Sequence, residues 1–439
     1  MRMKVILTSA LFLSAAFPAF AESWTAITKL SGIPSAGSTS VAIDAAGNAV
    51  AVWREDSTCG QSSCSVLRSR TRADGKLWGA VTTVSVRDPL LQASYPTLNV
   101  SEAGNATAVW VDDSGLKTAD KPFGKPWTKP TLLLPTMQTI YSYGFVENRK
   151  GDGVILIDST ILRRTAAGAW RTVVSPLPAS VPNSFIDSVA LGLTGELVAS
   201  WESYDRHCNA KRRCFVINFR LHAARLASGA STWVDSGVLA GPDSGAGTSL
   251  GDHGGVLAID DRGRVGLISV QNGTTYTVLT NTPGQPWSAA VPLAPTISVG
   301  MINGFQSDAT GDATVLVTET GGRVSAIAGS LGGGAFALQA SLSGSDRAPF
   351  NPLLAMSPSG SAAATWGFGD PNFSPSSIAV TTRPNANAPW RARTDLTGVL
   401  QAARPQSIAA AGVDRAVAGW DDYDNTETIS RANAGVHQP

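Results

Sequence analysis

The sequence predicts an all-β protein built from eight repeated four-stranded sheets, and three observations lead to this fold class. A strand–turn–strand motif, which ends in Trp in its clearest copies, recurs eight times at a mean spacing of about 52 residues. A second motif, a Gly or Pro turn followed by an aromatic residue and an extended run, alternates with the first at the same spacing. Gly and Pro contribute 44 and 25 of the 439 residues, which indicates many short connections rather than long helices.

The first motif predicts two antiparallel strands, A and B, joined by a tight turn. The turn holds Gly followed by Asn, Asp or Glu, residues that accept or flank a positive φ. Strand B is apolar on both faces, as expected of a strand buried between two layers. The clearest copies span residues 41–53, 98–110, 189–201 and 353–366, and weaker copies surround Gly151, Gly263, Gly311 and Asp414.

The second motif predicts strand D, which starts at the aromatic residue, after an alternating strand C such as residues 65–71. Together the two motifs contain all twelve Trp of the chain. We expect the aromatic residues of the second motif to pack between neighbouring sheets and to bury roughly 200 Å² each. They are Trp24, Trp78, Trp127, Trp170, Trp233, Trp287, Phe336 and Trp390.

Four strands in about 52 residues, repeated eight times, are typical of a β-propeller with eight blades. Tandem sandwiches need a period of roughly 100 residues, and a β-helix needs a shorter one. Seven blades remain an alternative if the short unit between Trp127 and Trp170 is irregular. The chain begins with a D strand at Trp24 and ends with strands A, B and C, so the N-terminal strand should complete the last blade and close the ring.

The first 21 residues predict a secretory signal. Residues 1–4 carry two cations, residues 5–17 are apolar, and Ala19-Phe20-Ala21 fits a cleavage site before Glu22. The alternative is a membrane anchor, but the apolar run is shorter than the roughly 20 residues that span a bilayer, and Pro18 breaks it. We therefore expect residues 22–439 to form a single propeller domain without a membrane span, in the periplasm or secreted.

Four cysteines agree with an oxidising compartment. Cys59 lies close to Cys64 in the chain, and Cys208 lies close to Cys214. The pairs predict two local disulfides, each closing a short loop. The alternative is a metal site, but neither spacing matches a zinc motif well, and we predict no metal.

Composition excludes several function classes. Lys and Arg number 34 against 33 for Asp and Glu, so the charge gives no nucleic-acid footprint. Phosphate-binding loops, dinucleotide fingerprints and nucleophile elbows do not occur in a supporting context, and we predict no cofactor. The remaining expectation is a monomer with a glycan or protein ligand.

Meander geometry places the A–B and C–D turns on one face of the disc and the longer, variable B–C and D–A loops on the other. Because function concentrates on variable loops, we predict the site on the B–C and D–A face. Carboxylates follow strand B in most blades and form either a solvated rim or a negative mouth for cations, amino groups or a basic partner. The acidic candidates are Glu55, Asp112, Glu202, Asp205, Asp370, Asp422 and Asp424.

Three further candidates are basic. Arg206 borders the cysteine loop at residues 208–214, which suits an acidic partner or an anionic sugar. His253 stands in a long D–A loop beside an acid and glycines, and Arg347 stands in another D–A loop. Two carboxylates about 5 Å or roughly 6.5 to 9.5 Å apart would permit glycoside hydrolysis, and the acid-rich run 421–427 would permit calcium.

The turn Trp motif resembles the Asp-box repeats of sialidase-type propellers and the docking repeats of quinoprotein-like propellers. Residues 73–78, Ala-Asp-Gly-Lys-Leu-Trp, are the closest copy. The resemblance implies an exported bacterial propeller. The Arg-containing sialidase segment is absent, so no catalytic residue carries over. We expect a binding module for a glycan or protein, with a carbohydrate-active enzyme or an envelope scaffold as alternatives.

Overall fold

The computed structural model is all-β. It describes residues 23–438 except 26, 34, 60–61, 86–94, 136–142, 167, 178–183, 209–213, 244–254, 272–274, 345–348, 370–375, 398–401 and 424–429. Within these residues no helix is long and apolar enough to cross a membrane. The predicted leader at residues 1–21 lies outside them.

Each of the first four blades is an antiparallel sheet of strands in the order A to D. Their strands are β3 (Ala36–Ile43), β4 (Ala49–Cys59), β5 (Ser62–Arg72) and β6 (Thr82–Thr83); β7 (Thr97–Val100), β8 (Ala106–Asp112), β9 (Gly115–Lys121) and β10 (Thr131–Pro135); β11 (Tyr143–Glu147), β12 (Gly153–Ile157), β13 (Thr160–Arg164) and β14 (Arg171–Val173); β15 (Ser184–Leu191), β16 (Leu197–Cys208), β17 (Cys214–Leu226) and β18 (Val234–Asp243).

The next three blades repeat this order, and the eighth combines both ends of the chain. Their strands are β19 (Val256–Ile259), β20 (Val265–Gln271), β21 (Thr275–Asn281) and β22 (Val291–Pro292); β23 (Val299–Ser307), β24 (Asp312–Glu319), β25 (Val324–Ser330) and β26 (Ala337–Ser341); β27 (Phe350–Met356), β28 (Ala362–Gly369), β29 (Ser376–Arg383) and β30 (Thr394–Asp395); β31 (Ala402–Ala411), β32 (Arg415–Tyr423) and β33 (Ser430–Gln438) with β1 (Ser23–Trp24) and β2 (Thr28–Lys29).

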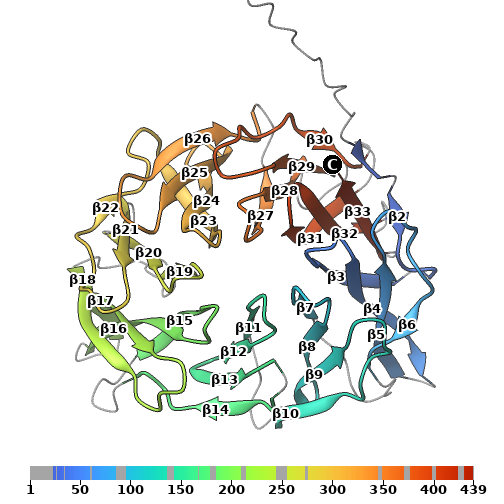
Figure 1. The fold of residues 1–439 in the computed structure, drawn as a ribbon, viewed down its shortest axis with the longest axis horizontal. Helices are drawn as coiled ribbons and strands as arrows, with labels where there is room; N and C mark the ends of the chain where they lie inside the picture. The colour runs from blue at the N-terminus through green and yellow to red at the C-terminus, as the bar shows by residue number, and fades with distance from the viewer. Residues whose placement is uncertain are drawn as a thin grey trace, which may run out of the picture.

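The blades form a closed ring with the A strands innermost (Figure 1). β1 pairs with β33, where Trp24 lies opposite His437, so the N-terminal strand completes the last blade. The prediction of eight blades and of ring closure is confirmed, and seven blades are excluded. The short third blade, β11 to β14, is regular in its pairing.

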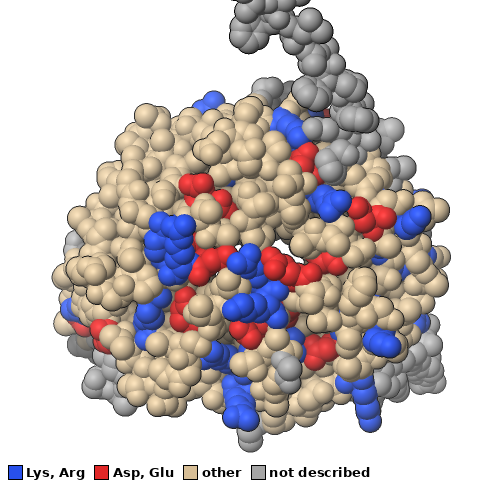
Figure 2. Space-filling model, viewed as in Figure 1, with Lys and Arg blue, Asp and Glu red and all other residues tan. Residues whose placement is uncertain are grey.

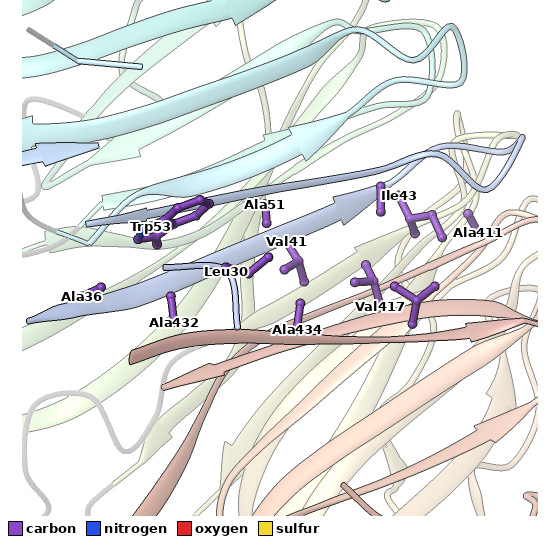
Figure 3. Close-up of a cluster of buried hydrophobic side chains, with 12 residues drawn as sticks. Leu30, Ala36, Val41, Ile43, Ala51, Trp53, Ala411, Val417, Ala432 and Ala434 are labelled. Carbon is purple, nitrogen blue, oxygen red and sulfur yellow. The ribbon is translucent and has the colours of Figure 1, made fainter. Parts of the chain in front are cut away.

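The closing seam is the interface between the eighth and the first blade. Its core is a continuous cluster of buried apolar side chains from β3, β4, β31, β32 and β33, drawn in Figure 3. Trp53 is fully buried in this cluster, and Leu30 reaches it from the segment that follows β2. Burial of these side chains stabilises the ring because roughly 25 cal/mol is gained for each Å² of apolar surface removed from water.

The Trp residues occupy two kinds of position. All five in B strands are fully buried: Trp53, Trp110, Trp201, Trp366 and Trp420. The seven turn Trp are half-buried and pack against the clusters between blades, which confirms their predicted place. Several also donate to the preceding blade; the indole of Trp233, for example, bonds the carbonyl of Val174 at 2.7 Å. Trp24 lies within β1, whereas in the other blades strand D begins shortly after the aromatic residue rather than at it.

In several blades the A–B turn is held by a side chain at its first residue. The carboxylate of Asp44 accepts the amide of Asn48 at 2.8 Å, and that of Asp308 accepts the amides of Thr310 and Asp312. Such side-chain bonds favour turns over extended backbone. A positive φ follows in every blade, as the sequence predicts, at Gly47, Gly104, Gly151, Gly195, Gly263, Gly311, Gly360 and Asp414.

Candidate functional site

The central channel holds two joined cavities. The first, of about 380 Å³, lies at the beginning of the A strands, where the D–A loops enter. The second, of about 530 Å³, lies at the A–B turns. Both are lined by Ala42, Asn99, Ile408 and Ala409, so the cavities are continuous along β3, β7 and β31.

The first cavity, which we call the neutral mouth, is lined by residues 38–42, 95–99, 353–354 and 406–409. Its polar groups are hydroxyls and amides, and none of these residues carries a charge. Hydroxyl and amide groups both donate and accept hydrogen bonds. The neutral mouth therefore suits a ligand rich in uncharged hydroxyls.

Hydroxyls of the neutral mouth also satisfy the free edges of the inner strands. Ser407 of β31 accepts the amide of Val41 and donates to the carbonyl of Thr39, both at 2.9 Å, across the closing seam. Ser40 of β3 accepts the amide of Leu98 in the second blade at 3.1 Å. Because buried backbone groups need partners, these bonds explain why polar residues stand at the inner edge.

Tyr95 is the one exposed aromatic residue among those lining the neutral mouth, with 68% of its surface accessible. The hydroxyl of Tyr143 in the third blade donates to the carbonyl of Tyr95 at 2.5 Å. Burial raises the pKa of Tyr143 to about 12, so its phenol stays protonated and able to donate. The backbone that carries Tyr95 is thus fixed while its ring remains free to contact a ligand.

The second cavity, which we call the charged end, is lined by residues 42–45, 99–102, 147, 149, 306, 355–356, 358–359 and 408–412. Arg149 bridges three blades there: its guanidinium lies 2.5 Å from Asp261 of the fifth blade and 3.4 Å from Glu102 of the second. Burial raises the pKa of Asp261, the negative charge of Asp260 adds to the rise, and Arg149 opposes it. Figure 2 shows basic and acidic side chains gathered around a narrow central opening.

Arg164 forms two further ion pairs beside the charged end. Arg164 donates to Glu147 at 3.2 Å and to Asp120 of the preceding blade at 2.7 Å. Burial raises the pKa of Glu147 to about 7, and the charge of Arg164 opposes that rise. The charged end therefore combines several ionisable groups in little space.

Three of the predicted acidic residues are buried between blades. Glu55 accepts the indole N–H of Trp53 at 3.0 Å and pairs with Arg68 at 3.1 Å. Asp112 pairs with Lys117 at 2.7 Å. Glu202 is buried, and its negative charge adds to the effect of burial in raising the pKa of Asp187.

The other predicted residues lie apart or outside the described part. Asp205 is exposed and pairs with Arg220 at 3.2 Å. Burial raises the pKa of Asp422 to about 6, and the indole of Trp420 opposes this rise. None of these five described acids lines either cavity, and their role in binding stays a prediction. His253, Arg347, Asp370 and Asp424 lie outside the described residues, as does the side chain of Arg206.

The cysteines lie at the tips of two B–C hairpins. In β16–β17 the backbone register places Cys208 opposite Cys214, and in β4–β5 Cys59 and Cys64 stand near the hairpin end. Both pairs are therefore local in the fold. The two disulfides stay a prediction.

Sequence reasoning missed Tyr95, Gln406, Glu102 and Arg149. Tyr95 and Gln406 stand just before or within an inner strand on the predicted face, and that place in the repeat was the signal that could have found them. Glu102 and Arg149 stand in A–B turns, on the face that was assigned no function. Their ion pair joins blades whose turns are far apart in the chain, which no spacing indicates.

Comparison with known proteins finds low likeness. No protein-family model and no curated protein sequence matches the chain. A Dyadobacter fermentans protein of unknown function matches 94% of this chain and 99% of its own, with 11% identity and a TM-score of 0.37. A Hadza microbial sialidase aligns with 91% of this chain and 65% of the sialidase chain, with 10% identity and a TM-score of 0.35. A lectin of Aleuria aurantia in complex with Fucα1-6GlcNAc aligns with 70% of this chain and 95% of the lectin chain, with 14% identity and a TM-score of 0.35.

Proposed function

We propose that this protein is a binding module that takes an uncharged glycan in the neutral mouth of its channel. The observation that carries the proposal is the lining: apolar residues alternate with hydroxyls, amides and an exposed tyrosine, without a charged residue among residues 38–42, 95–99, 353–354 and 406–409. A charged wall would lose hydration on contact with a neutral sugar, whereas hydroxyls and amides exchange one hydrogen bond for another.

Size and shape support the same ligand class. A cavity of about 380 Å³ falls within the range of small-ligand sites, roughly 300 to 1,000 Å³. The ring of Tyr95 offers an apolar surface on which the C–H face of a sugar can pack, with a phenol at its edge. Ser38, Thr97 and Gln406 line the same cavity with groups that can orient sugar hydroxyls.

The neutral mouth lies at the start of the A strands, the end of the channel at which the sequence predicts a site. The predicted leader and cysteine pairs favour a periplasmic or secreted protein, in which such a mouth meets sugars outside the cytoplasm.

Binding of lactose, cellobiose and maltose, measured by saturation-transfer NMR, tests the proposal. We expect Tyr95→Ala to lower the affinity roughly tenfold, since the contact between the ring and the sugar is lost. Phe123→Ala is the matched control: Phe123 is 61% exposed but lies in a C–D turn on the opposite face, and its loss should leave binding unchanged.

Two results would contradict a neutral binding module. Binding of acidic but not neutral oligosaccharides would move the site to charged residues. Hydrolysis of a bound sugar that stops on changing a single carboxylate to its amide would make the protein an enzyme.

A further inference from the structure

Asp421 lies directly behind the neutral mouth, in the closing seam. It follows Trp420 in β32 and is 1% exposed. Its two carboxylate oxygens accept hydrogen bonds from the first blade, one from the amide of Ser38 and one from the hydroxyl of Thr39, both at 2.7 Å. One carboxyl from the end of the chain thus holds two mouth residues from its beginning.

The segment that Asp421 holds is strained. Ser38 has a φ of 56°, a left-handed conformation that costs non-glycine residues about 1 to 2 kcal/mol. The register between β3 and β4 shifts between Gly37 and Ser40, so Ser38 and Thr39 bulge out of the ladder. Such conformations persist where surrounding bonds enforce them, and here the carboxylate supplies those bonds.

In the described part of the chain, charged groups stand on several elements around Asp421. Asp422 follows on the same strand, and Arg404 stands opposite in the register of β31. From the first blade, Glu55 and Arg68 face the same seam, where they pair with each other. Burial raises the pKa of Asp421 to about 7, the bonds from Thr39 and Ser38 oppose the rise, and the charge of Asp422 adds to it.

We propose that Asp421 is a positioning residue of the neutral mouth, which sets the conformation of Ser38 and Thr39 through its own charge. The inference rests on the proposed function for its meaning, because these two residues line the proposed sugar site. The charged carboxylate accepts both bonds on separate oxygens. Once protonated, one oxygen carries a hydrogen and its bond weakens, since hydrogen bonds to ionised groups are roughly twice as strong as neutral ones.

The two consequences of this charge have opposite signs. Because the folded pKa of about 7 exceeds the ordinary value of 3.8, Asp421 contributes stability at low pH that is lost as the pH rises through about 7. Locally, the same rise in pH tightens the bonds to Ser38 and Thr39. A local probe of the mouth therefore separates positioning from a general effect on stability.

Hydrogen exchange of the amides in residues 36–43, corrected for intrinsic rates and followed by mass spectrometry from pH 5 to 9, is that probe. We expect exchange of the Ser38 amide to slow roughly fivefold as the pH rises, with a midpoint near 7. Asp421→Asn should remove this step. Glu319→Gln, a buried carboxylate of the sixth blade that accepts from Ser325, is the matched control and should retain it.

Thr39→Val decides the question even if Asp421→Asn fails to fold. It keeps the side-chain shape but removes one donor to the carboxylate, so the midpoint should move to higher pH. A wild-type profile without a step, a step that survives Asp421→Asn, or an unmoved midpoint in Thr39→Val would each overturn the inference. The measurement uses no sugar, so absent disaccharide binding with an intact step would refute the proposed function alone.

Discussion

The two ends of the channel are built from the same inner strands but differ in chemistry. The neutral mouth presents hydroxyls, amides and Tyr95, whereas the charged end is crossed by Arg149 between Glu102 and Asp261. The difference arises from position in the repeat. The first residues of the A strands lie at the end of the channel predicted to carry the variable loops. The A–B turns lie at the other end; they need polar side chains to hold their backbone and are therefore rich in carboxylates. One ring therefore has two chemically distinct ends.

The largest effect should come from breaking the ring that both ends share. Trp53 is fully buried in the closing seam, and Trp53→Ala should lower the free energy of unfolding by about 3 to 5 kcal/mol, because it leaves a large cavity. Urea unfolding followed by circular dichroism measures the loss. Leu77→Ala is the control: Leu77 is 92% exposed, and its loss should cost less than about 0.5 kcal/mol. Equal losses would contradict a ring sealed at this seam.

A smaller loss of stability, together with a wider opening at the charged end, is expected from removing Arg149. Arg149→Ala removes the cation between Glu102 and Asp261, so the two carboxylates repel and the opening widens. Because these groups are a quarter to a half exposed, the stability loss should stay below about 1 kcal/mol. A Cys introduced by Met356→Cys in this cavity should then react several-fold faster with an uncharged maleimide.

The control for this opening is Arg323→Ala. Arg323 pairs with Glu319 at 2.8 Å in the sixth blade and lines neither cavity. Its loss should leave the labelling rate unchanged. An unchanged rate in Arg149→Ala would show that Arg149 does not close the charged end.

The fold was readable from the sequence because each blade carries the same physical requirement. An aromatic residue must fill every seam and a turn must reverse every A strand, so both recur at a fixed period. Ring closure followed from the order of motifs at Trp24 and at the C-terminal strands. The repeated signal made the fold predictable without any single decisive residue.

The site was less readable because strand geometry sends the acids elsewhere. Side chains alternate along a strand, so Glu55, two residues after Trp53, shares its face and turns into the seam beside the indole. Tyr95 and Gln406 carry no charge and no repeat signature. Arg149 meets Asp261 only because the ring brings turns of separate blades together.

The most direct test of the account is to fill each end of the channel in turn. Gln406→Trp places a bulky side chain at the neutral mouth, and Ser359→Trp places one at the charged end. With both variants folded by circular dichroism, binding of lactose, cellobiose and maltose should disappear in Gln406→Trp and persist in Ser359→Trp. Binding that persists in Gln406→Trp and disappears in Ser359→Trp would contradict the assignment of the ligand to the neutral mouth.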